Sequence, residues 1–97
     1  MKTQSTLAAI ALLAALTGAA RAECYADYKA KKAPPLQLHY GVLALAGPEC
    51  ANPRAAKRAI QARIAQDGWT LLNVLSIFGP EGLAERRGSA GDYFLRY

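Results

Sequence analysis

Three side chains of this chain are of types that often carry catalysis: Cys24, Cys50 and the single histidine, His39. A thiol and an imidazole are the groups that a small thiol-dependent or hydrolytic enzyme needs, and an enzyme using Cys50 or His39 is our alternative hypothesis. General acid–base catalysis also requires a positioned reacting group, and no carboxylate partner for His39 is evident. We therefore expect a protein that is not an enzyme.

The same residues argue against a bound metal or cofactor. One His and two Cys fall short of the four ligands of structural zinc. No Ser lies in a nucleophile elbow, and no Gly-rich loop joins a strand to a helix with phosphate-binding spacing. We expect neither a metal nor a cofactor.

Residues 1–22 have the pattern of a cleavable secretory signal peptide. Lys2 forms a positive start, an apolar run begins at Leu7, and Ala20-Arg21-Ala22 is a small-residue cleavage site. The apolar run is about 14 residues long, whereas a membrane-spanning helix needs roughly 20. We therefore expect no transmembrane span after cleavage, and a periplasmic or secreted protein.

An exported domain of this size favours a disulfide between Cys24 and Cys50. Cleavage after residue 22 of the 97-residue chain leaves 75 residues, and cores this small often need a covalent link. Two cysteines in an oxidising compartment allow one intramolecular pairing. A redox-active pair is the alternative, but such pairs usually lie close together as Cys-x-x-Cys.

The hydrophobic periodicity of residues 23–97 predicts a polar, Lys-rich arm followed by one small domain. Residues 23–35 are assigned to the arm and residues 36–97 to the domain. The predicted elements are a half-buried strand over 36–44, a helix over 53–66, a central strand over 69–78, an irregular loop over 79–91 and a last strand over 93–97. Asn52-Pro53 is expected to begin the helix and Gly68 to end it.

These elements indicate an α+β fold in the order β-α-β-β, with one amphipathic helix on a three-stranded, mainly antiparallel sheet. The last strand is expected to pair antiparallel with residues 69–78. The Gly68-Trp69 pair, the apolar strand after it and the terminal Tyr93-Phe94-Leu95-Arg96 resemble a family of small bacterial domains of unknown function. That resemblance covers residues 36–97 and implies the same fold, but it transfers no site residues.

Candidate binding residues come from the basic and aromatic composition. Without Lys2 and Arg21, ten Lys and Arg oppose seven Asp and Glu, a net charge of +3. The basic residues cluster at Lys29–Lys32, on the predicted helix and at Arg86-Arg87. We expect Arg86, Arg87, Tyr93 and Tyr97 to contact a partner, which would be an envelope protein or an anionic lipid or polysaccharide headgroup.

The less specific alternatives are a solvated basic face and tyrosines that pack the edge of the sheet. Nucleic acid is not expected as a partner outside the cytoplasm.

Overall fold

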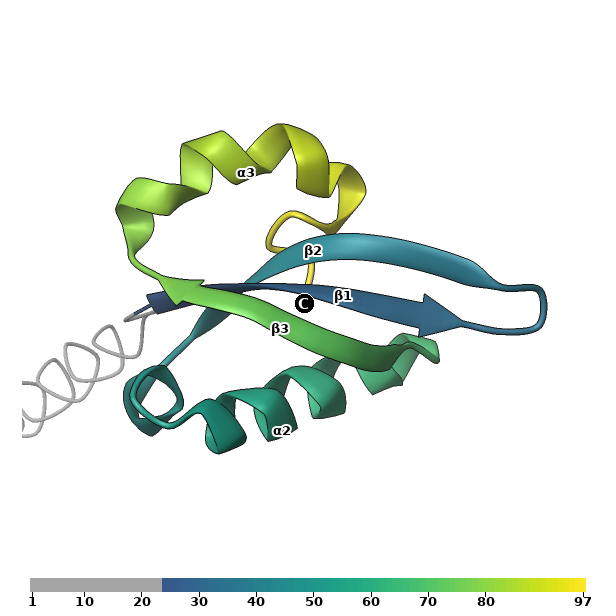
Figure 1. Cartoon of the computed structure of the whole chain (residues 1–97), viewed down its shortest axis with the longest axis horizontal. Coiled ribbons are helices and arrows are strands. Elements are labelled where there is room, and N and C mark those ends of the chain that lie inside the picture. Colours follow the sequence, from purple (N-terminus) through teal and green to yellow (C-terminus); the bar gives the residue numbers. More distant parts are fainter. Residues whose placement is uncertain (1–23) are drawn as a thin grey trace, which may run out of the picture.

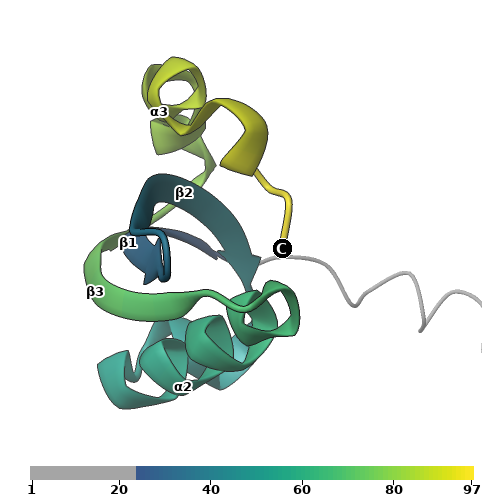
Figure 2. The same cartoon turned by 90° about the vertical axis from the view of Figure 1, so that its right-hand side faces the viewer.

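The computed structural model describes residues 24–97, so the predicted signal peptide, residues 1–22, lies outside the described part of the chain. A three-stranded antiparallel sheet lies between two helices, which cover opposite faces (Figure 1, Figure 2). The elements are the strands β1 (Cys24–Lys32), β2 (Gln37–Leu45) and β3 (Thr70–Phe78) and the helices α2 (Pro53–Ile64) and α3 (Leu83–Ala90). The α+β class and the three-stranded antiparallel sheet are confirmed, but the order of the described elements is β-β-α-β-α.

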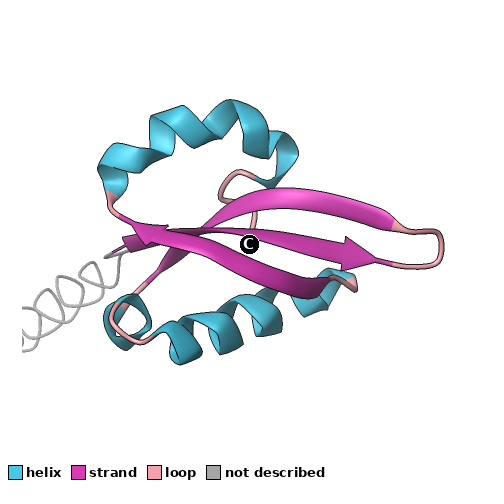
Figure 3. Ribbon diagram, viewed as in Figure 1, coloured by secondary structure: helices cyan, strands magenta, loops and turns pink. Residues whose placement is uncertain are grey.

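The central strand of the sheet is β1, because the strand order is β2-β1-β3 (Figure 3). The prediction of a polar arm over residues 23–35 is therefore wrong for the described residues. The side chains of Ala26, Tyr28 and Ala30 are fully buried on one face, while the lysines at 29 and 31 are exposed. Small alanines hid this alternation, because lysines dominate the composition of the segment. Residues 33–36 form the turn into β2.

Helix α2 packs its narrow apolar stripe against this buried face. The stripe consists of Ala56, Ile60 and Ile64, all fully buried. The side chain of Asn52 caps the helix by accepting hydrogen bonds from the backbone N–H groups of residues 54 and 55, at 3.0 and 3.2 Å. Gly68 then adopts the left-handed conformation, with φ of 85°, which glycine adopts without a steric penalty. The predicted helix start is confirmed. The α-helix itself ends at Ile64, and Gly68 ends the 3-10 helix over Ala65–Asp67 that continues it.

The strand β3 is an edge strand, so its expected central position is wrong. Its apolar run has another cause than coverage on both faces. The pairing of β3 with β1 shifts twice, so that Leu75 and Leu72 have no partner residue in β1. The side chains of these bulge residues are 44% and 47% exposed. A strand covered by other elements on both faces would have a continuous apolar run. In β3, by contrast, the run includes exposed leucines. Trp69, just before β3, is 5% exposed and lies in the core.

Residues 79–91, expected as an irregular loop, form a 3-10 turn over Pro80–Gly82 followed by α3. Glycines lie at both ends of α3, and their number suggested disorder. Their positions have a structural reason: a Cβ on Gly82 would lie 2.7 Å from both Arg86 and Phe78, and Gly91 has φ of 53°. The short helix depends on tertiary contacts, which local sequence does not reveal.

The C-terminal segment does not form the expected strand beside β3. Residues Gly91–Tyr93 form a 3-10 turn, after which Phe94 makes an isolated parallel bridge with Val42 of β2. The N–H of Leu95 donates to the carbonyl of Val42 at 2.8 Å. Arg63 of α2 donates to the carbonyls of Tyr97 and Ala44. The segment therefore closes part of the free edge of β2.

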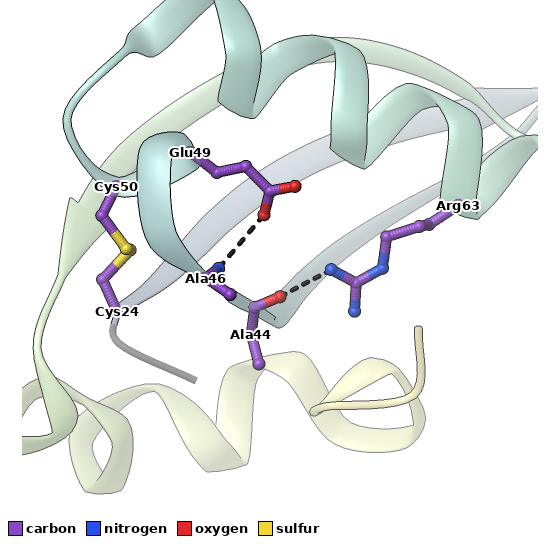
Figure 4. Close-up of a disulfide and its surroundings, with 6 residues drawn as sticks. All are labelled: Cys24, Ala44, Ala46, Glu49, Cys50 and Arg63. Carbon is purple, nitrogen blue, oxygen red and sulfur yellow. Dashed lines mark hydrogen bonds between the residues drawn. A yellow bond between two sulfur atoms is a disulfide. The ribbon is translucent and has the colours of Figure 1, made fainter. Parts of the chain in front are cut away.

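The predicted disulfide is present and joins the start of β1 to the 3-10 helix η1 (Gly47–Cys50) (Figure 4). The Cα atoms of Cys24 and Cys50 are 5.9 Å apart. Beside it, the N–H of Ala46 donates to the carboxylate of Glu49 at 3.1 Å. Among residues 24–97, no helix is long and apolar enough to cross a membrane.

Candidate functional site

The two edges of the sheet differ in how they are covered. The edge of β2 is partly closed by the C-terminal segment, whereas β3 pairs only with β1 in the described chain. The nine residues of β3 include no charged residue and no proline. Proteins usually protect an exposed edge with such residues, because unpaired N–H and C=O groups invite another strand. Apart from its two bulges, at Leu72 and Leu75, β3 itself carries none of the features that protect an edge strand.

Two shallow hollows between α2 and β3, which share Lys57, form what we call the α2–β3 groove. The β3 side is lined by Leu71, Asn73, Val74, Ser76 and Ile77. The α2 side is lined by Pro53, Arg54, Lys57, Arg58, Gln61 and Ala62. An extended segment lying here would meet strand backbone on one side and a helix on the other.

The side chain of Gln61 already occupies one end of this groove. Its Nε2 donates to the carbonyl of Trp69 at 3.3 Å, and its Oε1 accepts from the N–H of Leu71 at 2.8 Å. An amide that donates to one residue and accepts from the residue two positions later imitates the peptide group of a neighbouring strand. No other hydrogen bond to the outer edge of β3 is found within residues 24–97.

The α2 rim of the groove is cationic. Arg54, Lys57 and Arg58 are exposed, and α2 contains no acidic residue. None of the three forms an ion pair with a described residue. Their charge is therefore available to a ligand, and it favours a negatively charged one.

A second cluster surrounds His39, which is 8% exposed. Its Nε2 lies 2.9 Å from the hydroxyl oxygen of the buried Tyr28. The imidazole stacks on Tyr93 with ring centres 3.7 Å apart and meets the edge of Trp69 at 4.3 Å. Tyr97 extends the stack and donates its hydroxyl proton to the Asp67 carboxylate at 2.8 Å. The cluster attaches the C-terminal segment to the face covered by α2.

The environment of His39 favours the neutral imidazole. Burial, reinforced by the positive charges of Lys32 and Arg96, lowers the pKa of His39 to about 4. Burial likewise raises the pKa of the Tyr28 hydroxyl above its ordinary value. Nδ1 of His39 is buried and has no hydrogen-bond partner among the described residues. This geometry suits aromatic packing better than proton transfer to a solvent-borne substrate.

A third polar cluster fixes α3 to the opposite face of the sheet. The Asp27 carboxylate accepts hydrogen bonds from Ser76 at 2.6 Å, Tyr40 at 2.8 Å and Arg86 at 3.0 Å. Burial alone would raise the pKa of Asp27, but these hydrogen bonds lower it below the ordinary value. Burial and the Asp27 carboxylate raise the pKa of Tyr40 to about 12. All three donors are occupied in holding the fold together.

The structure does not bring the four residues expected to bind a partner into one surface. Arg86 is bonded to Asp27 and to the Gly82 carbonyl, with its guanidinium 3.9 Å from the centre of the Phe78 ring. Arg87 is exposed and lies over Phe94 at 4.7 Å. Tyr93 and Tyr97 belong to the His39 cluster. Their binding roles stay a prediction.

The residues of the enzyme hypothesis are engaged in other contacts. Cys50 is bonded to Cys24, and the described chain holds no free cysteine. Within residues 24–97, no group of three or more His, Cys, Asp or Glu side chains is placed to hold a metal ion.

Sequence reasoning missed the α2–β3 groove, because β3 was expected in the centre of the sheet. The one available signal was the run Arg54, Lys57 and Arg58 on a helix without acidic residues. Comparisons of the chain with protein-family models, with curated proteins and with solved structures find no match.

Proposed function

We propose that this protein is an exported binding module that holds an extended, acidic segment of a partner protein along the outer edge of β3. The observation that carries the proposal is a nine-residue edge strand without a charged residue or a proline, beside a cationic helix. Strand addition to such an edge supplies main-chain hydrogen bonds for affinity and side-chain contacts for specificity. The other sheet edge is partly closed, so β3 is the edge available to a partner.

The chemistry of the groove describes the expected ligand. Leu71, Val74 and Ile77 are half-buried on the face of β3 toward α2, so Arg54, Lys57 and Arg58 line the same face. Side chains that an added strand directs to this face would meet the cations, and the side chains between them would lie on the opposite face, where Leu72 is exposed beside Lys29. We therefore expect a ligand in which acidic residues face α2 and apolar residues alternate with them.

The charge on α2 makes a partner protein a better occupant than a second copy. Antiparallel two-fold pairing of β3 with itself would place both α2 helices on the same face of the joined sheet. Their cationic rims would then approach each other, and like charges oppose association. An acidic partner removes this repulsion.

The disulfide supports the exported location, because disulfides persist in oxidising compartments such as the periplasm. We therefore propose that the protein works as a periplasmic or secreted accessory protein. A small core with one disulfide is sufficient for a domain that binds its partner through the edge of β3.

The test uses two labelled peptides, one alternating Val and Glu and one alternating Val and Lys. We expect the Glu peptide to bind and to protect β3 amides against hydrogen exchange, because they become hydrogen-bonded. The double variant Lys57→Gln, Arg58→Gln should weaken binding by about fivefold, the effect of two surface ion pairs. Arg87→Gln, on α3, is the matched control and should bind as wild type does.

Two results would contradict the proposal. One is equal binding of the Lys peptide, which would mean that the α2 charges do not select the ligand. The other is a stable dimer, in analytical ultracentrifugation of the free protein, whose β3 amides are already protected. That dimer would identify a second copy as the occupant of the edge.

A further inference from the structure

The β1–β2 hairpin forms a second exposed surface, remote from the α2–β3 groove. We define the hairpin tip as residues 31–38, which are exposed apart from the half-buried Lys32. Figure 1 shows that this tip extends beyond the ends of both helices. Neither helix therefore covers it, and it is free to touch a large, flat partner.

The tip is the most exposed apolar part of the described domain. Leu36 and Leu38 are 67% and 65% exposed, the highest values among its large apolar side chains. Pro34 and Pro35 are exposed beside them. Leu72 of β3, 47% exposed, lines a hollow together with Leu38. The apolar surface therefore continues from the turn onto the face of the sheet.

Lysines flank this apolar surface. The exposed Asp67 precedes Gly68, which lies beside Lys32, and the Asp67 carboxylate is bonded to the Tyr97 hydroxyl. Lys29 and Lys31 are exposed on β1, where Lys31 pairs with Leu38 across the strands. Residues 28–48 include no Asp or Glu, and Asp27 is buried under Arg86. An apolar tip with a lysine collar matches the layers of an anionic bilayer, in which acyl chains lie beneath negative headgroups.

The backbone of the turn also suits partial dehydration. An N–H group that leaves water without a partner costs free energy, and this cost limits which loops can enter a membrane interface. Pro34 and Pro35 carry no N–H group, so the turn has two fewer donors to dehydrate. The long side chains of Lys29 and Lys31 can place their ammonium groups among headgroups while their methylenes remain with the leucines.

We infer that the hairpin tip docks the protein on an anionic phospholipid bilayer by inserting Leu36 and Leu38 at the headgroup boundary. This surface is separate from the α2–β3 groove, so a protein segment and a bilayer could be bound at the same time. The inference goes beyond the proposed function and does not depend on it.

The experiment is flotation, with vesicles, of the chain expected after signal-peptide cleavage, residues 23–97. One set contains equal parts of phosphatidylglycerol and phosphatidylcholine, and the other contains phosphatidylcholine alone. We expect flotation with the anionic vesicles only. It should fall between 0.1 M and 1 M salt, as the Debye length shortens from about 10 Å to about 3 Å.

Substitutions at the tip test the inserted residues. The double variant Leu36→Asn, Leu38→Asn should lower the partition coefficient by at least about tenfold, because two apolar side chains no longer leave water. Leu36→Trp should raise it, since Trp favours the membrane interface. Leu95→Asn is the control: Leu95 is 43% exposed and has φ of 57°, a conformation that Asn tolerates.

Charge variants separate this surface from the groove. The double variant Lys29→Gln, Lys31→Gln should lower the partition coefficient by roughly tenfold or more, because each lysine near an anionic surface contributes about fivefold to binding. Lys57→Gln, Arg58→Gln should float as wild type does. The inference is overturned if wild type does not float, if the Leu36, Leu38 variant floats equally well, or if only the α2 charges matter. Circular dichroism confirms that each variant is folded.

Discussion

At the scale of single residues, the polar side chains that looked reactive in the sequence are used to hold the fold. His39 lies within an aromatic stack, and Arg86 is bonded to a buried carboxylate. Neither role is visible from neighbouring residues, because the partners Tyr28, Tyr93 and Asp27 are distant in sequence. What the sequence did indicate correctly is Cys24 pairing with Cys50, since two cysteines allow only one intramolecular pairing.

The histidine makes stability depend on pH in a defined range. In the folded protein the pKa of His39 is about 4, whereas an unfolded histidine titrates near 6.5. Between these values the unfolded chain binds the extra proton, so stability rises with pH. We expect the free energy of unfolding to decrease by up to about 3 kcal/mol as the pH falls from 6.5 to 4.

Urea denaturation at a series of pH values measures this effect. His39→Phe keeps a ring in the stack and removes the titrating group, so its stability should be nearly flat over the same range. The Asp27 carboxyl adds little to the slope above about pH 5, because in the unfolded chain it titrates near the ordinary value of 3.8 and its folded pKa is lower still. Its own contribution is lost as the pH falls through 3.8 toward that lower pKa. An equal slope in His39→Phe and wild type would show that another group titrates.

At the scale of elements, local signals predicted β2 and α2, and tertiary contacts decided β1, β3 and α3. The period-2 pattern after Leu36 and the Asn52-Pro53 cap are local, so the strand and the helix could both be predicted. The pattern assigns the faces of the strand wrongly, because it places Leu36 and Leu38 on the apolar face, although they are 67% and 65% exposed, and His39 on the polar face, although it is buried. The lysines of β1 led to the prediction of a polar arm where a strand forms. The leucines of β3 led to the prediction of a central strand, and the glycines near α3 to the prediction of a loop. In each case a long-range contact overrides local preference.

The helix α3 should depend on the Asp27 carboxylate. Asp27→Asn keeps the shape of the side chain but removes the charge that Arg86 faces. Hydrogen bonds to a charged group are roughly twice as strong as neutral ones, so we expect α3 amides to exchange about tenfold faster. Amides of β1 and β2 should change less, because local opening need not involve the central strand. Uniform acceleration across the domain would instead indicate global destabilisation.

The disulfide should account for much of the stability of the domain. It closes a loop with a sequence separation of 26 residues, and constraining the unfolded chain in this way contributes about 3.5 kcal/mol. Cys24→Ser or Cys50→Ser should therefore each lower stability by about 2 to 5 kcal/mol, and the double variant by little more. Equal melting curves with and without reductant would contradict this expectation.

At the scale of the whole molecule, the domain presents two separate surfaces on a small scaffold. The α2–β3 groove runs along one edge, and the hairpin tip projects at one end. Neither surface was predicted from the sequence. The groove combines α2 with β3, which are separate in the chain. The hairpin tip is continuous, but its residues were divided between the expected arm and the expected first strand, and the pairing of β1 with β2 is what joins them.

The charges of α2 should also keep copies of the protein apart. Neutralising them in Lys57→Gln, Arg58→Gln removes repulsion between two β3 edges, so we expect more self-association than in wild type. Light scattering over a range of protein concentration measures it, with Arg87→Gln as the control. High salt should raise self-association of wild type toward that of the variant. No difference between the two would show that another feature protects the edge.

The side chain of Gln61 restricts the register in which another strand can pair with the edge of β3. Because its amide is already bonded to Trp69 and Leu71, an added strand has to begin at Leu72 or displace it. A shift of one residue turns every side chain of a strand to the other face. The Gln61 contacts would therefore select a single register for the added strand. Replacing Gln61 with Ala would free that end of the edge and allow ligands to slide to longer or shifted alignments.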